Sequence, residues 1–271
     1  MNPLFRAMAR KIMAPRKGYP TDLTPKSEVE HLIRSLWPLR GGKELIRLGP
    51  SGDGGYLVPD DLEGIVACYS PGVSTVSGFE WECAERGMQV FLADASVDKP
   101  AVDHPRFHFT KKFIGAFDEG EFTTLSRWVD AAALPPQTDF LLQMDIEGYE
   151  YETLLSTPID LMQRFRIIVI EFHWLDQLWN RPFFRIASRA VHKLLLTHAC
   201  VHIHPNNCRP TLSHLGLEIP EYAEFTFYRR DRITDTGFAN RFPHPLDCDN
   251  TDDPPVPLPK CWYGSAETRE N

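Results

Sequence analysis

The hydrophobic pattern of the chain alternates between two kinds of segment. Short apolar runs, rich in β-branched and aromatic residues, predict strands, and longer runs with apolar residues three and four positions apart predict helices. Strands are expected at 63–72, 89–96, 106–117, 139–145, 165–174, 200–204 and 223–230. Helices are expected at 76–87, 122–134, 149–156 and 183–199.

Strands that alternate with helices of this length indicate crossover connections. We therefore expect an α/β fold, a doubly wound, Rossmann-like and mostly parallel seven-stranded sheet with helices on both faces. Only a loop, 205–221, separates the last two strands, and a parallel pair needs a longer crossover, so the last strand is expected to be antiparallel. One domain is expected over 41–271, with a leader and a helix in 1–40 packed on it.

Composition and charge narrow the class of protein. With 42% hydrophobic and 24% charged residues the chain is an ordinary globular protein, and its net charge of −8 disfavours nucleic acid as a partner. No run approaches the roughly 18 apolar residues of a membrane span, so no stable membrane insertion is expected. The six cysteines form no CxxC pair, which favours reduced thiols and a cytoplasmic location. Residues 1–20 are basic and lack the apolar centre of a signal peptide, which favours a frayed leader over a transit peptide or a membrane-surface helix.

Acidic residues stand where three of the predicted strands end. Asp94 ends the second strand, Asp145 and Glu147 end the fourth, and Glu171 ends the fifth together with His173. In open α/β sheets, ligands bind at the carboxyl ends of the strands. The acids are therefore expected to face a ligand.

The spacing of Asp94 favours a ribose in that ligand. Asp94 follows Gly72, the end of the first strand, at about the 20-residue distance at which an acid takes the ribose hydroxyls of a nucleoside. The turn SPGVSTVSG lacks the GxGxxG that admits a pyrophosphate, which disfavours a dinucleotide and favours S-adenosylmethionine. An ordinary tight turn at Gly72 and a helix N-cap at Asp94 remain alternative interpretations.

The sequence also resembles a known family. The segment LLQMDIEGYEYETLL (141–155) is similar to the signature of the FkbM-type methyltransferases, Lys-Ile-Asp-Ile/Val-Glu-Gly-x-Glu, with Gln143-Met144 in place of Lys-Ile. Further similar segments are GDGGYLVP (52–59), YSPGVSTVSGFE (69–80), FLADAS (91–96), VHIHPNN (201–207) and PEYAEFTFYRR (220–230). The resemblance covers the chain from about residue 45 onward, but the first turn has Pro71, Ser74 and Ser77 where the family is commonly richer in glycine. It implies a class I methyltransferase fold, S-adenosylmethionine as donor, and O-methylation of a hydroxyl on a sugar or a secondary metabolite.

The candidate site residues follow from the strand ends and from this resemblance. Cofactor binding is expected of Tyr69, Ser70, Gly72, Asp94, Ala95 and Asp145. Catalysis needs a base or a metal ion to handle the acceptor's proton, and it is expected of Asp145, Glu147, Glu171 and His173. Substrate binding is expected of Asp53, Tyr56, His202, His204, Asn206 and Asn207.

Several of these residues carry alternative interpretations. Asp145 and Glu171, on neighbouring strand tips, are expected to hold Mg2+; alternatively, Asp145 only contacts the methionine end of the donor or caps the next helix. His202 and His204 serve either the substrate or the packing of the strand end. The segment GDGG is the turn of a hairpin whose second strand is YLVP, or the edge of a lid. Glu150 and Glu152 are expected in the first turns of a helix, where the helix dipole favours them.

Two other classes of function remain open. One is a nicotinamide-dependent oxidoreductase on a similar sheet, which the missing GxGxxG disfavours. The other is a non-catalytic binding protein with a degenerate methyltransferase fold, which the retained acids disfavour. The expected partner is a small-molecule or glycan acceptor.

Overall fold

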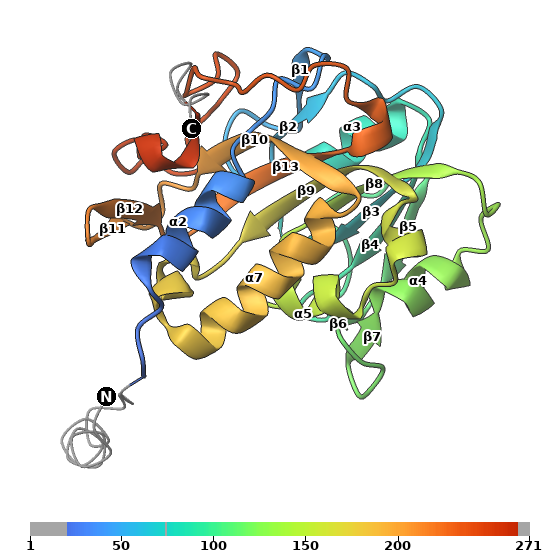
Figure 1. The fold of residues 1–271 in the computed structure, drawn as a ribbon. Coiled ribbons are helices and arrows are strands. Elements are labelled where there is room, and N and C mark those ends of the chain that lie inside the picture. Colours follow the sequence, from blue (N-terminus) through green and yellow to red (C-terminus); the bar gives the residue numbers. More distant parts are fainter. Residues whose placement is uncertain (1–20, 74, 265–271) are drawn as a thin grey trace.

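The centre of the computed structural model, which describes residues 21–73 and 75–264, is a seven-stranded sheet (Figure 1). Its strands lie in the order β10–β13–β9–β8–β3–β4–β5. Their bounds are β3 Ile65–Pro71, β4 Gln89–Ala93, β5 Phe107–Thr110, β8 Asp139–Met144, β9 Phe165–Phe172, β10 His198–Pro205 and β13 Ala223–Arg229. Neighbours from β5 to β9 pair in parallel, and β13 is antiparallel to both β9 and β10. The predicted fold class is confirmed, including its antiparallel last strand.

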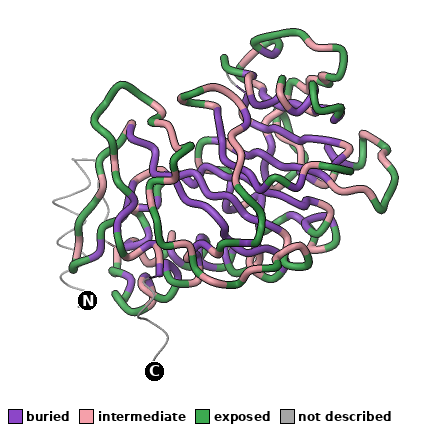
Figure 2. The backbone as a smooth tube through the Cα atoms, turned by 90° about the horizontal axis from the view of Figure 1, so that it is seen from above, coloured by how far each residue is buried: buried purple, intermediate pink, exposed green. Residues whose placement is uncertain are grey.

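The central strands are buried on both faces, and Figure 2 shows that buried residues gather in the middle of the molecule. All eight residues of β9 are buried, and so are the five residues of β8 from Phe140 onward. Strands covered on both faces read as continuous apolar runs without alternation. This explains why FRIIVIEF stands out in the sequence, and why the first charges after such a run mark the end of the strand.

Different elements cover the two faces of the sheet. One face packs against α2 (Lys26–Ser35), α4 (Leu125–Ala131), α5 (Glu150–Ser156), α6 (Ile159–Met162) and α7 (Arg181–Leu195). The other face packs against α3 (Gly78–Glu85) and the hairpin of β1 (Leu45–Leu48) with β2 (Tyr56–Pro59). The predicted hairpin with YLVP as its second strand is therefore confirmed. Residues of the β1–β2 hairpin, which covers this second face, can therefore reach the carboxyl ends of the strands.

Two predicted elements differ from the structure near residue 112. The run 106–117 is not one strand, because it forms β5 and then, after Lys111 and Lys112, β6 (Phe113–Gly115). β6 leaves the main sheet and pairs in parallel with β7 (Phe122–Thr124), which occupies the predicted start of a helix. Helix α4 begins only at Leu125, with Thr124 as its N-cap, whose side chain accepts a hydrogen bond from the Arg127 amide. The two lysines interrupt an apolar run that otherwise reads as continuous.

The loop 205–221 contains more order than the sequence pattern predicts, and the C-terminal tail is an irregular segment packed against the body of the protein. A small hairpin, β11 (Thr211–His214) with β12 (Leu217–Pro220), lies between β10 and β13. The tail packs against the end of β10, where Asn207 Nδ2 donates hydrogen bonds to the Thr251 and Asp253 carbonyls at 3.0 and 2.7 Å. The predicted frayed leader, 1–20, lies outside the described residues. Among the described helices, none has the length and apolar character that crossing a membrane requires.

Acids at the amino ends of the strands are neutralised by arginines. Arg166 is 7% exposed and binds Asp139 at 2.7 Å, and its Nη1 donates to the Asp61 and Glu63 carbonyls. Arg232 binds the Asp61 carboxylate at 2.8 Å. These cations hold the pKa of Asp61 and Asp139 below their usual values. At the opposite, carboxyl ends of the strands, within residues 21–73 and 75–264, the ion pairs of Asp145 and Glu147 involve a histidine and no arginine.

Candidate functional site

Two adjoining cavities lie at the carboxyl ends of β3, β4 and β8. The larger strand-end cavity, about 380 Å³, is lined by Gly72, Ala93, Asp94, Ser96, Phe113, Ile114, Phe122, Asp145, Ile146, Glu147 and Tyr149. The smaller strand-end cavity, about 70 Å³, is lined by Asp53, Gly54, Tyr56, Gly72, Val73, Thr75, Val76, Glu80, Gln143 and Asp145. Gly72 and Asp145 line both cavities. Together the two cavities lie along the carboxyl ends of the strands, which is where an α/β fold binds its ligand.

Gly72 is required by the close approach of two strand ends. Its φ is +88°, and a Cβ at this position would lie 1.5 Å from the Asp145 carbonyl oxygen. The Gly72 amide donates to the Ala93 carbonyl at 2.9 Å, and the Asp145 amide donates to the Pro71 carbonyl at 3.3 Å. Only glycine adopts this conformation at this distance without strain. The turn therefore does more than reverse the chain, because it sets the spacing between the β3 and β8 tips.

Asp94 lies at the end of β4 in the wall of the larger cavity. The residue is 5% exposed, and its Oδ1 accepts hydrogen bonds from the Ser96 amide and hydroxyl at 2.8 and 2.6 Å. Residues 95–99 form no helix, so the N-cap interpretation of Asp94 does not apply. Ala95, the other residue expected here, does not line either cavity, whereas Ala93 lines the larger one. Ser96 fixes the Asp94 carboxylate as an acceptor at the cavity wall.

Three aromatic residues that the sequence did not single out also line the larger strand-end cavity. Phe113 comes from β6, Phe122 from β7, and Tyr149 from the turn before α5. The ring centroids of Phe113 and Phe122 are 5.5 Å apart, and those of Phe122 and Tyr149 are 5.1 Å apart. These rings give the cavity an apolar wall close to Asp94, a combination that suits a flat base attached to a sugar.

A buried polar network supports the smaller cavity. Ser70 Oγ lies 2.5 Å from Glu80 Oε1 and 2.6 Å from Gln143 Oε1, and Gln143 Nε2 donates to the Tyr56 hydroxyl at 3.1 Å. Burial raises the pKa of Glu80 to about 7 and raises that of Tyr56 well above its ordinary value. Glu80 and Gln143 line the smaller cavity, and Ser70 lies behind them. Tyr69 is placed differently, because it is fully buried in the core, with its ring stacked on Phe91 at 4.8 Å.

His173 lies at the centre of three carboxylates. Its Nδ1 is 3.0 Å from Glu150 Oε1, and its Nε2 is 3.7 Å from Asp145 Oδ1 and 3.5 Å from Glu147 Oε2. Its pKa is raised, because hydrogen bonding to Glu150 and the nearby negative charges outweigh its burial. Burial is the main cause that raises the pKa of Asp145 to about 7. The predicted residues Asp145, Glu147 and His173 are therefore brought together.

Glu150 is the site residue whose role the sequence obscured. It does begin α5, but its side chain is fully buried and turned back toward the strand ends. Its Oε1 accepts from the Ile146 and Gly148 amides, each at 3.1 Å, and contacts His173. One carboxylate therefore shapes the 145–148 loop and orients the histidine. The contact with His173 crosses 23 residues, which a local helix rule does not detect.

The 145–148 loop has a strained backbone. Glu147 has φ +56°, an unusual conformation for a residue with a side chain. Gly148 follows with φ +102°, and a Cβ there would lie 2.3 Å from the Trp174 ring. Strained residues are retained when their surroundings determine the conformation, as Glu150 does here by binding two loop amides. In this loop conformation Glu147 lies beside His173.

Glu171 lies farther along the sheet, in a second polar group. It is directly opposite Glu224 on β13, which in turn is opposite His204 on β10. Asn206 donates to Glu171 Oε1 at 3.0 Å. Burial, followed by the charges of Asp145 and Glu224, raises the pKa of Glu171 well above its usual value. Glu171 is not part of the set of mutually close ligand atoms that the described residues form, which contains Asp145, Glu147 and His173.

Most of the predicted substrate residues contact the C-terminal tail. Asp247 lies 2.8 Å from His202 Nε2 and 3.7 Å from His204 Nδ1, and these histidines hold its pKa below the usual range. Asn207 also binds the tail. The polar residues at the end of β10 therefore serve in large part to pack the C-terminal tail against the sheet. Asp53 and Tyr56 line the smaller cavity.

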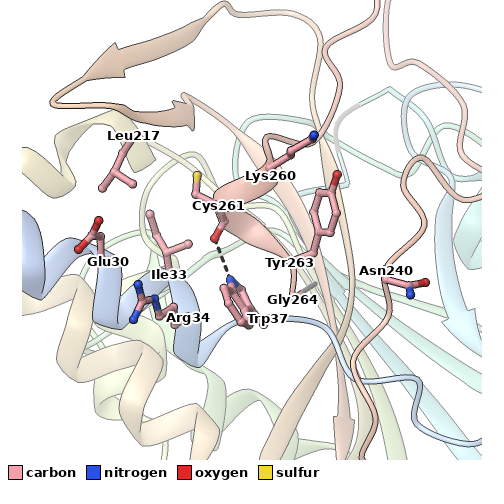
Figure 3. A pocket seen from close by; sticks show the side chains of 10 residues that line it. All are labelled: Glu30, Ile33, Arg34, Trp37, Leu217, Asn240, Lys260, Cys261, Tyr263 and Gly264. Atoms are coloured by element: carbon pink, nitrogen blue, oxygen red, sulfur yellow. Dashed lines mark hydrogen bonds between the residues drawn. The ribbon is translucent and has the colours of Figure 1, made fainter. Parts of the chain in front are cut away.

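A larger cavity lies elsewhere, between α2 and the C-terminal turn (Figure 3). It measures about 770 Å³, and Trp37 closes one side by donating a hydrogen bond to the Cys261 carbonyl at 2.8 Å. None of the residues predicted to act in binding or catalysis lines it. Size alone therefore does not identify the candidate site, whereas six of the predicted residues line the strand-end cavities: Asp53, Tyr56, Gly72, Asp94, Asp145 and Glu147.

Comparisons with known proteins give weak structural likenesses only. No known family profile and no curated protein matches the sequence. A protein described as a methyltransferase from an antibiotic biosynthesis pathway of Anabaena variabilis is 14% identical, with a TM-score of 0.26, over 52% of this chain and 60% of that one. The 1,6-didemethyltoxoflavin N1-methyltransferase of Burkholderia thailandensis, solved with bound 1,6-didemethyltoxoflavin and S-adenosylhomocysteine, is 13% identical, with a TM-score of 0.28, over 61% and 72%. The protein EvdMO1 is 13% identical, with a TM-score of 0.28, over 79% and 49%. Likenesses this weak do not establish a shared function.

Proposed function

We propose that this protein is an S-adenosylmethionine-dependent methyltransferase that methylates a hydroxyl of a sugar or a secondary metabolite. The observation that carries the proposal is the position of Asp94. Its carboxylate is held at the end of β4, beside an aromatic wall and next to the Gly72–Asp145 junction of the two cavities. The FkbM-type signature at 145–150 supports the same function.

The two strand-end cavities suit different parts of the donor. Asp94 would accept hydrogen bonds from the two ribose hydroxyls, and Phe113, Phe122 and Tyr149 would hold the adenine ring. The methionine end would pass Gly72 into the smaller cavity, toward Tyr56. This orientation brings the sulfonium close to Asp145, since Asp145 lines both cavities.

The proposed reaction requires alignment and the removal of one proton. The bond between sulfur and the methyl carbon breaks, sulfur keeps the electron pair, and the acceptor oxygen forms the new bond to carbon. The hydroxyl proton leaves to a base or to water. Because the methyl group is already activated, positioning supplies much of the rate enhancement. Asp145 lines both cavities, so its carboxylate is the group next to the sulfonium position that can take up the proton.

Isothermal titration with S-adenosylhomocysteine tests the donor site. We expect Asp94→Asn to weaken binding about tenfold, because loss of a charge-assisted hydrogen bond costs on the order of 1.5 kcal/mol. Asparagine retains the side-chain oxygen that Ser96 binds, so the fold is preserved. Asp98→Asn is the matched control, since Asp98 is an exposed acid in the same loop that pairs with Lys111. Equal affinity in the two variants, or binding of NADH in place of S-adenosylhomocysteine, would contradict the proposal.

A further inference from the structure

The two ring nitrogens of His173 have different surroundings. Nδ1 faces Glu150, which fixes the ring and makes this nitrogen the donor. Nε2 points at the carboxylates of Asp145 and Glu147 but forms no hydrogen bond with any described residue, although the side chain is only 4% exposed. A lone pair that faces two carboxylates is repelled by them. A positively charged species between the three groups removes this repulsion.

The distances favour a metal ion over a proton as that species. Nε2 is 3.5 Å from Glu147 and 3.7 Å from Asp145, which is too long for a good N–H···O hydrogen bond. Ligand atoms that each lie about 2.1 Å from one ion are roughly 3.0–3.5 Å apart. One ligand atom from each of the three residues lies within 4.8 Å of the others. The group is therefore close to the spacing of a coordination shell.

We propose that Asp145, Glu147 and His173 bind one divalent metal ion. Glu150 is then the positioning residue of the site, since a metal-binding histidine usually gives its other nitrogen to a carboxylate. This ligand set replaces the pair Asp145 and Glu171 that the sequence suggested.

The charges around the site support a cation. Within residues 21–73 and 75–264, the ion pairs of Asp145, Glu147 and Glu150 involve His173 and neither lysine nor arginine. Near the amino ends of β8 and β3, by contrast, Asp139 and Asp61 each pair with an arginine. Like charges at this distance destabilise one another unless a cation lies between them.

The ligand set indicates which ions suit the site. Two carboxylates and an imidazole favour Mn2+ or a similar first-row ion over Mg2+, which prefers oxygen ligands. The Glu147 side chain is 86% exposed, so the ion can enter from solvent and keep water molecules on that side. Asp145 also lines the larger cavity, and this joins the ion to the ligand site.

The role of the ion depends on the proposed function. Bound there, it would lower the pKa of an acceptor hydroxyl that replaces one of its waters and would fix the oxygen near the methyl group. Metal binding itself requires neither the donor nor the acceptor. The two proposals can therefore fail separately.

Titration with Mn2+, followed by the loss of its free-ion electron paramagnetic resonance signal, tests the site. We expect one Mn2+ per wild-type chain and at least tenfold weaker binding in Glu147→Gln, whose exposed side chain makes misfolding no concern. His173→Ala should weaken binding further. Glu119→Gln, which removes an exposed acid outside the group, should bind as the wild type does.

Three outcomes would overturn the assignment. They are the absence of Mn2+ binding by the wild type, equal binding by Glu147→Gln and Glu119→Gln, and weaker binding by Glu171→Gln with no effect of His173→Ala. S-adenosylhomocysteine titrated into the same preparations separates the two proposals. A protein that binds S-adenosylhomocysteine but not Mn2+ loses only the metal site, and the reverse result removes only the donor site.

Discussion

Replacing Gly72 by alanine perturbs the point at which the two strand-end cavities meet. The added Cβ would lie 1.5 Å from the Asp145 carbonyl oxygen and 2.7 Å from its carbon, both of them backbone atoms that no rotamer change can move. The β3 and β8 tips must therefore separate. We expect this variant to be less stable and to bind S-adenosylhomocysteine more weakly.

Two effects contribute to the magnitude. The φ of +88° costs an alanine roughly 1–2 kcal/mol. Forcing the two backbones apart costs roughly 1–3 kcal/mol more, which is the range for overpacked sites. Gly87→Ala is the matched control, because Gly87 has φ +94° but nothing within 4 Å of the added Cβ. Only the first cost applies to the control.

Urea unfolding of both variants separates the two effects, and titration with S-adenosylhomocysteine reports on the site. We expect Gly72→Ala to lose more stability than Gly87→Ala, and only Gly72→Ala to lose affinity. Equal stability losses, with unchanged affinity in both variants, would show that the strand-tip spacing does not matter. That result would refute the reasoning.

Three further predictions concern the core and the larger cavity. Burial lowers the pKa of His198 to about 4, so its contribution to stability is present above pH 6.5 and is lost as pH falls toward 4. In urea unfolding at each pH, the wild type should lose about 3 kcal/mol more over this range than His198→Asn does. Arg166→Met should cost roughly 3–5 kcal/mol in the same assay, because it leaves the buried acids Asp61 and Asp139 without one of their cations, whereas Arg86→Met, at an exposed pair, should cost under about 1 kcal/mol. Phe122→Ala should weaken S-adenosylhomocysteine binding about tenfold in a calorimetric titration, since it removes the middle ring of the aromatic wall.

The sheet could be predicted because its central strands are buried on both faces. Such strands leave long apolar runs, and the first acid after each run marks the carboxyl end, as at Asp94 and Asp145. The antiparallel last strand followed from the short connection before it. These signals are local in the sequence. They match the folded structure because unpaired charges are disfavoured in the core.

The rest of the site depends on contacts between distant residues. Glu150 has an ordinary helix-start position, and only the fold reveals that it holds His173. Phe113 and Phe122 belong to β6 and β7, whose pairing is invisible in a run that reads as one strand followed by a helix. His202 and His204 alternate as a ligand pair would, but Asp247 in the tail binds both. In each case the deciding partner lies outside the local pattern.

A crystal structure of the protein with S-adenosylhomocysteine tests the central claim most directly. The account predicts density in the strand-end cavities, with both ribose hydroxyls on Asp94, the adenine against the aromatic wall of Phe113, Phe122 and Tyr149, and the sulfur facing Asp145. Density in the cavity between α2 and the C-terminal turn, or a ribose that does not contact Asp94, would contradict it.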